Sequence, residues 1–245
     1  MAQHGKRYIE SRDRIDRTTT YPPAQAMRML KEFPGAKFDE TVEVHFRLGL
    51  NVRHADEQLR GTLMLPHGTG KDVRIAVFAE GDKAREAQEA GADIVGSADL
   101  AKRIEEGFTE FDVAIATPDQ MGNVGRLGRI LGPRGLMPNP KTGTVTFDIA
   151  KAVSDAKAGK LEYRTDRGAN VHVAIGKKSF DERALVENYA AVVDEIVRAK
   201  PAAAKGRYIR QITLTSTMGP GIHVDPAKTR GIVEEFEEQA EAVPA

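Results

Sequence analysis

The clearest pattern in the chain is an alternation of apolar and polar residues over positions 41–50. Apolar side chains take every second position from Val42 to Leu50. This period of two predicts a strand in a sheet that has one buried and one solvent-facing side. The other elements predicted toward the two ends of the chain are strands at 61–65, 161–164, 171–175 and 208–217, and helices at 22–33 and 182–200.

The middle of the chain alternates between short apolar runs and helical segments. Gly91 and Gly159 are placed where two of the predicted helices should end. Strands that alternate with helices in this way predict a parallel sheet covered by helices. The predicted elements are strands at 73–79, 93–95 and 111–117, and helices at 82–90, at 98–106, from residue 118 onward, and at 147–157.

Two strand-rich ends around a parallel middle predict that the middle is an insertion. The predicted fold class is therefore α/β with two domains, a split α+β terminal domain and an inserted α/β domain. Two connections near residues 67 and 160 join the domains, a geometry that favours hinge motion. The predicted bounds are 1–67 and 160–225 for the terminal domain, 68–159 for the insertion, and 226–245 for an acidic tail that we expect to be disordered.

The formal net charge of zero conceals an uneven distribution. The tail holds two basic and five acidic side chains, and segment 68–159 holds 12 basic and 14 acidic ones. The remaining flanking segments therefore carry 22 basic and 17 acidic residues. An excess of this size suggests a phosphate-binding surface, although many solvated faces carry as much.

Composition excludes several classes of protein. The chain has no cysteine, and therefore no disulfide, thiolate zinc site or cysteine nucleophile. It has neither an apolar run of membrane-spanning length nor a signal sequence. We therefore expect a cytoplasmic protein that is not bound to a membrane.

Two glycine-rich segments offer weak signals for a nucleotide site. Segment 67–72 is a glycine-rich turn followed by a lysine, a combination that can bind phosphate. However, Leu65 and Asp72 stand where a phosphate loop needs glycine and a hydroxyl. A flexible connector is the favoured interpretation. Segment 121–140 holds three arginines, but it follows the third strand of the insertion and lacks the Gly-x-Gly-x-x-Gly spacing.

Catalytic patterns are absent from the sequence. The six histidines show no His-Glu-x-x-His spacing, and no Gly-x-Ser-x-Gly elbow is present. The sequence therefore predicts no enzyme, no catalytic residue, no metal, no cofactor and no small-molecule substrate.

Two segments fit RNA binding. Phe38 follows Lys37 at the entrance of strand 41–50, where a ring can pack on a base or sugar while the lysine meets phosphate. Taken alone, Phe38 is more often a residue at the edge of a core. Segment 213–220 ends a strand with hydroxyl side chains, which can donate to 2′-hydroxyl and phosphate groups, and Gly219 permits close approach of the backbone. The alternative is that these hydroxyls serve as caps.

Together, these segments resemble the bacterial form of the large-subunit ribosomal protein number one family, the stalk proteins. The resemblance covers almost the whole chain to about residue 225, and several of its strings are long. The residues that carry it are 37–45, 60–61, 65–68, 89–93, 116–119, Leu127-Gly-Arg-Ile-Leu-Gly-Pro-Arg-Gly-Leu136, 138–141, 205–206 and 215–220.

The resemblance implies a split domain that binds 23S ribosomal RNA at the mobile stalk near the exit site, and a Rossmann-like inserted domain. It also implies a place in the large ribosomal subunit, a part in releasing deacylated tRNA, and repression of the protein's own messenger RNA. The partners implied are thus 23S ribosomal RNA, exit-site tRNA and that messenger RNA. The RNA contacts implied are Lys37, Phe38, Thr41, Glu43, Thr215, Ser216, Thr217, Met218 and Gly219, to which we add Arg164, Asp166, Gly168 and His172.

Two departures and two rival functions stand beside this interpretation. Thr-Ser-Thr at 215–217 varies the three threonines more familiar in the family and keeps the hydroxyl donors. The acidic extension after Asp225 falls outside the family pattern. The rivals are an enzyme that binds a nucleotide in the inserted domain, and a messenger-RNA repressor that works off the ribosome.

Overall fold

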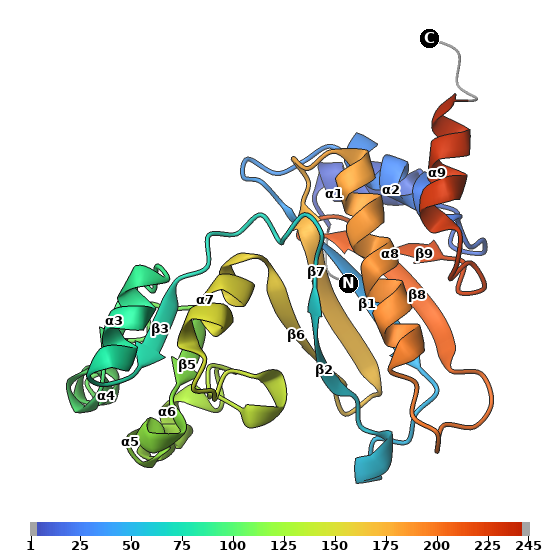
Figure 1. The fold of residues 1–245 in the computed structure, drawn as a ribbon. Helices are drawn as coiled ribbons and strands as arrows, with labels where there is room; N and C mark the ends of the chain where they lie inside the picture. The colour runs from blue at the N-terminus through green and yellow to red at the C-terminus, as the bar shows by residue number, and fades with distance from the viewer. Residues whose placement is uncertain (1–3, 242–245) are drawn as a thin grey trace. The chain divides into compact units, whose positions relative to one another are not determined.

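The computed structural model describes residues 4–241, which divide into two compact units. Unit 1 takes its described residues from Met1–Gly70 and Glu162–Ala245, and unit 2 is Lys71–Leu161. In the colours of Figure 1, unit 1 combines the blue-to-cyan and the yellow-to-red parts of the chain, and unit 2 is the middle part, from teal through green to yellow. The chain therefore passes between the units twice, at 70/71 and at 161/162.

Unit 1 contains segments from both ends of the chain. Its elements are α1 (Lys6–Asp13), α2 (Pro23–Glu32), β1 (Thr41–Leu48), the 3-10 helix η1 (Ala55–Glu57), β2 (Arg60–Met64), β6 (Lys160–Arg164, which begins at the unit boundary), β7 (Asn170–Lys177), α8 (Glu182–Arg198), β8 (Ile209–Ser216), β9 (Ile222–Val224) and α9 (Ile232–Glu241).

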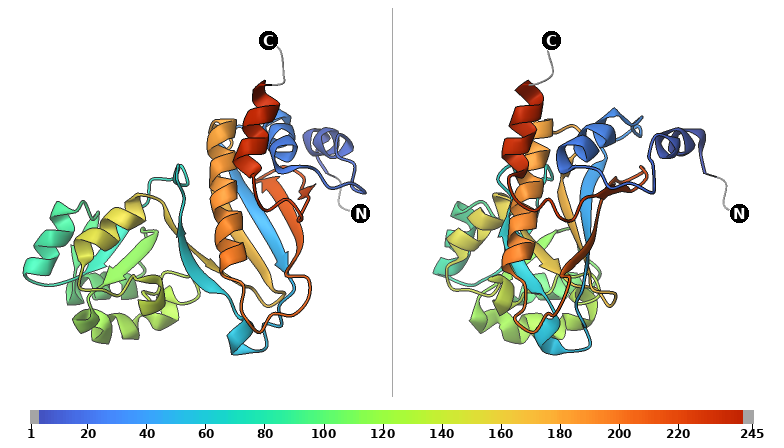
Figure 2. Two further views of the ribbon diagram at one scale, coloured as in Figure 1. Left: turned by 45° about the vertical axis from the view of Figure 1, so that its right-hand side comes forward. Right: turned by 90° about the vertical axis from the view of Figure 1, so that its right-hand side faces the viewer.

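The main sheet of unit 1 has the strand order β7-β1-β8-β9. The central strand β1 pairs antiparallel with β7 and β8, and the register sets His45 opposite both His172 and Thr213. The predicted alternation in β1 is confirmed, because Val42, the apolar residues that follow it at every second position and their partners on β8 are buried. Helices α2 and α8 pack against this buried face (Figure 2).

The opposite side of the same sheet, here called the open face, carries exposed or half-buried side chains. It consists of Glu43, His45 and Arg47 from β1, His172 from β7, Thr213 and Thr215 from β8, and His223 from β9. Strands β2 and β6 pair as a separate two-stranded sheet.

Four elements of unit 1 are absent from the sequence prediction: α1, η1, β9 and α9. The sequence predicts a disordered acidic tail from residue 226, but α9 forms a helix over Ile232–Glu241. The prediction is wrong here because Ile232 and Phe236, one helical turn apart, are both buried. Arg183 also pairs with Glu237 at 2.9 Å. Residues 242–245 of the predicted tail lie outside the described residues.

Unit 2 is a three-stranded parallel sheet in the order β4-β3-β5, as the alternation in the sequence predicts. Its first strand lies at the centre, an order also found at the start of doubly wound α/β sheets. The elements are β3 (Ile75–Phe78), α3 (Asp82–Glu89), β4 (Ile94–Gly96), α4 (Ala98–Glu105), β5 (Val113–Ala116), η2 (Pro118–Gln120), α5 (Met121–Arg126), α6 (Gly128–Leu131), η3 (Pro140–Thr142) and α7 (Ile149–Lys157).

Both faces of this sheet are covered. Ala76 and Phe78 of β3 point into one core with residues of α4, α5 and α6, and Ile75 and Val77 point into another with residues of α3 and α7. A strand buried on both faces is apolar throughout, which explains the continuous apolar run at 73–79. No described helix is both long enough and apolar enough to cross a bilayer.

The buried side chain of Asn188 on α8 fixes the first connection to unit 1. Its Oδ1 accepts a hydrogen bond from the backbone N–H of His67 at 3.0 Å. Its Nδ2 donates to the backbone carbonyls of Gly68 at 3.0 Å and Ile175 at 2.7 Å. The imidazole of His67 also lies 2.5 Å from a carboxylate oxygen of Glu187. The connector therefore remains part of unit 1 as far as Gly68.

Replacing Asn188 by alanine should lower the free energy of unfolding by at least about 2 kcal/mol, because buried backbone groups lose their partners. Urea unfolding followed by circular dichroism measures the change. On the same helix, the exposed Asp194 provides a control, and Asp194→Ala should alter stability by less than about 0.5 kcal/mol. Equal losses in the two variants would contradict this role of Asn188.

Candidate RNA interface

A buried carboxylate, Glu40, joins the start of β1 to the end of β8. Its Oε1 accepts a hydrogen bond from the backbone N–H of Ala36 at 2.5 Å. Its Oε2 accepts from the hydroxyl of Ser216 at 2.7 Å and from the backbone N–H of Met218 at 3.0 Å. Only 2% of Glu40 is exposed. These hydrogen bonds hold together two segments that are far apart in the sequence.

The ionised form of Glu40 is favoured despite its burial. Burial by itself raises the pKa of a carboxyl group. Here the hydroxyl of Ser216, the backbone donors of Met218 and Ala36, and the charge of Lys178 outweigh that effect. The pKa of Glu40 is therefore lowered from its ordinary value, and its carboxylate is charged at neutral pH.

Phe38 and Met218 are exposed on the two segments that Glu40 joins. Their exposed fractions are 55% and 50%, which is high for large apolar side chains. Phe38 is therefore not at the edge of the core. Lys37 is exposed beside it. We call the set Lys37, Phe38, Thr41, Thr217, Met218 and Gly219 the strand-end patch.

The hydroxyl of Thr217 extends the pairing of β1 with β8. It accepts a hydrogen bond from the backbone N–H of Thr41 at 2.9 Å, and it lies 3.3 Å from the carbonyl oxygen of Thr41, to which it donates. The backbone N–H of Thr217 also donates to that carbonyl, at 3.0 Å. These bonds make the strand-end patch a continuation of the sheet and not a free loop.

The structure corrects the expectation for Ser216. The period of β8 places this residue on the helix-facing side, where it is buried and its hydroxyl donates to Glu40. Ser216 therefore positions the patch and does not present its side chain to a ligand. Thr215 lies half-buried on the open face, and its hydroxyl faces the backbone carbonyls of Ser216 and Gly219.

The open face continues from the patch along β1. After Glu43, the next residue of β1 on the open face is His45. Its Nδ1 lies 2.9 Å from the Nδ1 of His172 on the neighbouring strand. One ring must donate and the other accept in this contact. Partial burial, together with the neighbouring His172, lowers the pKa of His45, although the carboxylate of Glu43 acts in the opposite sense.

Arg164, Asp166 and Gly168 lie near the other end of β1, on and after β6. Asp166 shapes the turn between β6 and β7, because its Oδ1 accepts from the backbone N–H of Gly168 at 2.8 Å and of Asn170 at 2.7 Å. Its Oδ2 accepts from the side chain of Asn170 at 3.0 Å. The carboxylate is thus occupied within its own turn, whereas the side chain of Arg164 is exposed.

Most of the residues predicted to contact RNA therefore fall into two groups, one near each end of β1. The strand-end patch adjoins Thr41, and the group at the β6–β7 turn adjoins the far end of β1, near Leu48. The eight residues of β1 separate the two ends by about 24 Å, since each step adds ~3.4 Å. Glu43 and His172 lie between them on the open face.

The chain is similar over most of its length to known proteins. The model of the family described as "Ribosomal protein L1p/L10e family" matches residues 30–220. The chain belongs to this ribosomal protein family. It is therefore a ribosomal protein and not an enzyme.

Close relatives carry the name "Large ribosomal subunit protein uL1". The relative from Thermobifida fusca is 62% identical over 228 residues, 93% of this chain and 97% of its own length. That from Rubrobacter xylanophilus is 61% identical over 227 residues, 92% and 99% of the two chains. That from Mycolicibacterium vanbaalenii is 58% identical over 235 residues, 96% of this chain and 100% of its own.

The family match includes both segments that form the strand-end patch, but the sequence prediction missed the residue that joins them. Glu40 lies two positions before Val42, in the buried phase of the β1 alternation. A carboxylate in a buried phase needs several donors. That signal could have identified Glu40. In residues 4–241, no group of three or more histidine, aspartate or glutamate side chains is placed to hold a metal ion.

Replacing Glu40 by glutamine should cost about 1–3 kcal/mol of unfolding free energy at pH 7. Both carboxylate oxygens of Glu40 accept hydrogen bonds, and the amide NH2 of glutamine, itself a donor, would replace one of them. The folded pKa of Glu40 is lowered, so its stabilising contribution is present above the unfolded pKa and is lost as pH falls through the folded pKa. Urea unfolding at pH 7 and pH 3 should show a difference between Glu40→Gln and wild type that shrinks in acid. Glu32→Gln, at an exposed position, is the control, and a difference independent of pH would contradict the assignment.

Proposed function

We propose that this chain is a structural constituent of the large ribosomal subunit that binds 23S ribosomal RNA at the mobile stalk, near the exit site. Family membership and the names of the relatives support a place in that subunit. The single observation that carries the RNA-binding surface is the exposed pair Phe38 and Met218, held on adjoining strand ends by Glu40.

The chemistry of the strand-end patch suits structured RNA. An exposed aromatic ring can stack on a base or a ribose, while the neighbouring Lys37 meets a phosphate. The backbone near Gly219 permits close approach of the RNA strand. Because Glu40 and Thr217 fix the patch to the sheet, little side-chain or loop entropy is lost when RNA binds.

The charge of the chain supports the same surface. The flanking segments 1–67 and 160–225 carry 22 basic and 17 acidic residues, whereas segment 68–159 carries 12 basic and 14 acidic residues. Positive charge therefore gathers in the part of the chain that forms the patch. Attraction to phosphate adds affinity that depends on salt, while the patch adds selectivity.

We propose further that the two units are separate domains, with residues 1–67 and 160–225 as the RNA-binding domain and 68–159 as an inserted Rossmann-like domain. Two connections between them provide a hinge. In this proposal the inserted domain contributes contacts with exit-site tRNA and assists release of deacylated tRNA. The protein acts in the cytoplasm, within the large subunit.

The same patch would also bind the protein's own messenger RNA if that RNA folds like the ribosomal site. Repression then follows when the protein exceeds the available ribosomal RNA. Competition between the two RNAs for one purified protein tests this part of the proposal. Simultaneous binding of both RNAs would show that they use different surfaces and would contradict it.

The decisive test of the patch is Phe38→Ala, measured by binding to a stalk-region fragment of 23S ribosomal RNA over a salt series. The variant should lose about 1–3 kcal/mol of binding free energy, the usual contribution of one base–aromatic contact. Because the lost contact is not ionic, the dependence of affinity on salt should stay unchanged.

Phe147 supplies the matched control, since it is 58% exposed and lies in unit 2. Phe147→Ala should bind the fragment as wild type does. Equal affinity of Phe38→Ala and wild type, or weak binding that any RNA can match, would contradict the proposed surface.

A further inference from the structure

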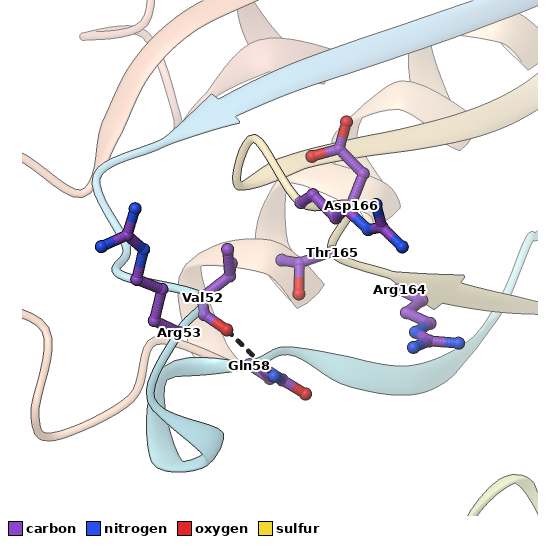
Figure 3. Close-up of a pocket in the computed structure, with 7 residues that line it drawn as sticks. Val52, Arg53, Gln58, Arg164, Thr165 and Asp166 are labelled. Atoms are coloured by element: carbon purple, nitrogen blue, oxygen red, sulfur yellow. Dashed lines mark hydrogen bonds between the residues drawn. The ribbon is translucent and has the colours of Figure 1, made fainter.

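A cavity of about 630 Å³ lies at the end of unit 1 marked by the β6–β7 turn (Figure 3). Two parts of the chain form it, the loop that follows β1 and the segment from the end of β6 into the turn. Its size is in the range of sites that hold small organic ligands. The lining residues are Val52, Arg53, Gln58, Arg164, Thr165, Asp166 and Arg167.

Three of the lining residues are arginines. The side chains of Arg53, Arg164 and Arg167 are exposed, and within residues 4–241 their guanidinium groups form no ion pair or hydrogen bond with the protein. Many other basic side chains of unit 1 are paired, such as Arg60 with Glu162 at 2.7 Å. Like charges gathered around a hollow repel one another unless an anion lies between them.

The one carboxylate in the lining does not neutralise these arginines. Asp166 accepts hydrogen bonds from Gly168 and Asn170 within its own turn, and its Oδ2 lies 3.7 Å from His172. The carboxylate of Asp166 therefore makes its hydrogen bonds within the turn and none with the three arginines. The cavity therefore keeps an excess of positive charge.

The cavity also offers groups that a base can use. Val52 and Thr165 supply a less polar part of the wall. Gln58 donates from Nε2 to the carbonyl of Val52 at 3.0 Å, which orients the amide and leaves its Oε1 as an acceptor. The planar guanidinium groups can stack on a base as well as bind phosphate.

The position of the cavity links it to the strand-end patch. The loop that carries Arg53 leaves the far end of β1, about 24 Å from Thr41 at ~3.4 Å for each residue. The open face runs between these ends. An RNA that binds the patch and follows the open face reaches the cavity.

We propose that the cavity is a second RNA subsite that takes one unpaired nucleotide of the RNA held by the strand-end patch. Arg53, Arg164 and Arg167 bind backbone phosphates of that nucleotide and its neighbours, and Gln58 accepts a hydrogen bond from its base. Arg53, Gln58 and Arg167 thereby join the RNA interface, which no feature of their local sequence indicates. The inference rests on the proposed RNA-binding function and deepens it.

The test is the double variant Arg53→Gln/Arg167→Gln of the full chain, with a stalk-region fragment of 23S ribosomal RNA as the probe. Fluorescence anisotropy over a potassium chloride series should show affinity about 10- to 100-fold below wild type. The slope of log affinity against log salt should fall by about 2, since two phosphate contacts are lost. Arg17→Gln/Arg230→Gln, which changes two exposed arginines of unit 1 away from the cavity, should match wild type.

A scan of abasic substitutions in the probe identifies the nucleotide. One unpaired position should weaken binding to wild type and weaken binding to the double variant less, because the base reaches Gln58 only when the arginines hold the RNA backbone at the cavity. Absence of any such position would overturn the nucleotide subsite. The same cavity chemistry could bind a free nucleotide instead of one within an RNA chain. Calorimetric titration with adenosine monophosphate distinguishes these two ligands, and tight binding of this free nucleotide would overturn the assignment to RNA.

Phe38→Ala, measured in parallel, separates the two proposals. If Phe38→Ala weakens binding but the double arginine variant keeps wild-type affinity and salt slope, the cavity inference fails and the proposed function stands. If both variants bind as wild type does, the proposed RNA surface fails with it.

Discussion

The geometry of the candidate interface depends on one buried charge. Glu40 lies immediately before β1, in the buried phase of the strand's alternation, and a carboxylate there must be compensated. Its donors come from the segment before β1 and from the end of β8. Since one carboxylate satisfies both, neither segment can shift without leaving the charge unpaired. The exposure of Phe38 and Met218 follows from this restraint.

The sheet supplies the rest of the surface because helices cover only one of its faces. Burial of the other face of the sheet against α2 and α8 keeps its strands in place, while the open face remains available to a partner. The candidate contacts are thus mounted on strand ends and tight turns, where hydrogen bonds already restrict them. Preorganisation of this kind reduces the entropy lost on binding and favours discrimination by shape, which is how proteins recognise most structured RNA.

The sheet of unit 2 differs from that of unit 1 in having both faces covered by helices. Helices cover both faces of its parallel sheet, so its strands are apolar and its interior shows no row of polar groups comparable to the open face. Its segment of the chain carries a small acidic excess, in contrast to the flanking segments. In unit 1, Asn188 binds the connector through buried hydrogen bonds. A hinge between the units would therefore begin beyond Gly68.

The sequence by itself determined the regular elements and the family. Periods of two and of 3.6 residues located the strands and helices to within about two residues at each end, because burial on one face is a local property of the pattern. It did not locate α1, β9 or α9, or the 3-10 helices η1 and η3. The two apolar residues that anchor α9, Ile232 and Phe236, stand among glutamates, and their burial depends on helices distant in sequence.

Only the tertiary structure decided how the candidate site is assembled. The local string around Phe38 fits the edge of a core as well as an exposed ring, and the hydrogen bonds of Glu40 decide between them. The hydroxyl of Ser216 looks equivalent to its neighbours in the sequence, yet the register of β8 turns it inward. Arg53 and Arg167 stand far apart in the chain and line one cavity because β1 pairs with β7 and β2 pairs with β6. Contacts between distant segments follow from register and packing, which no local pattern encodes.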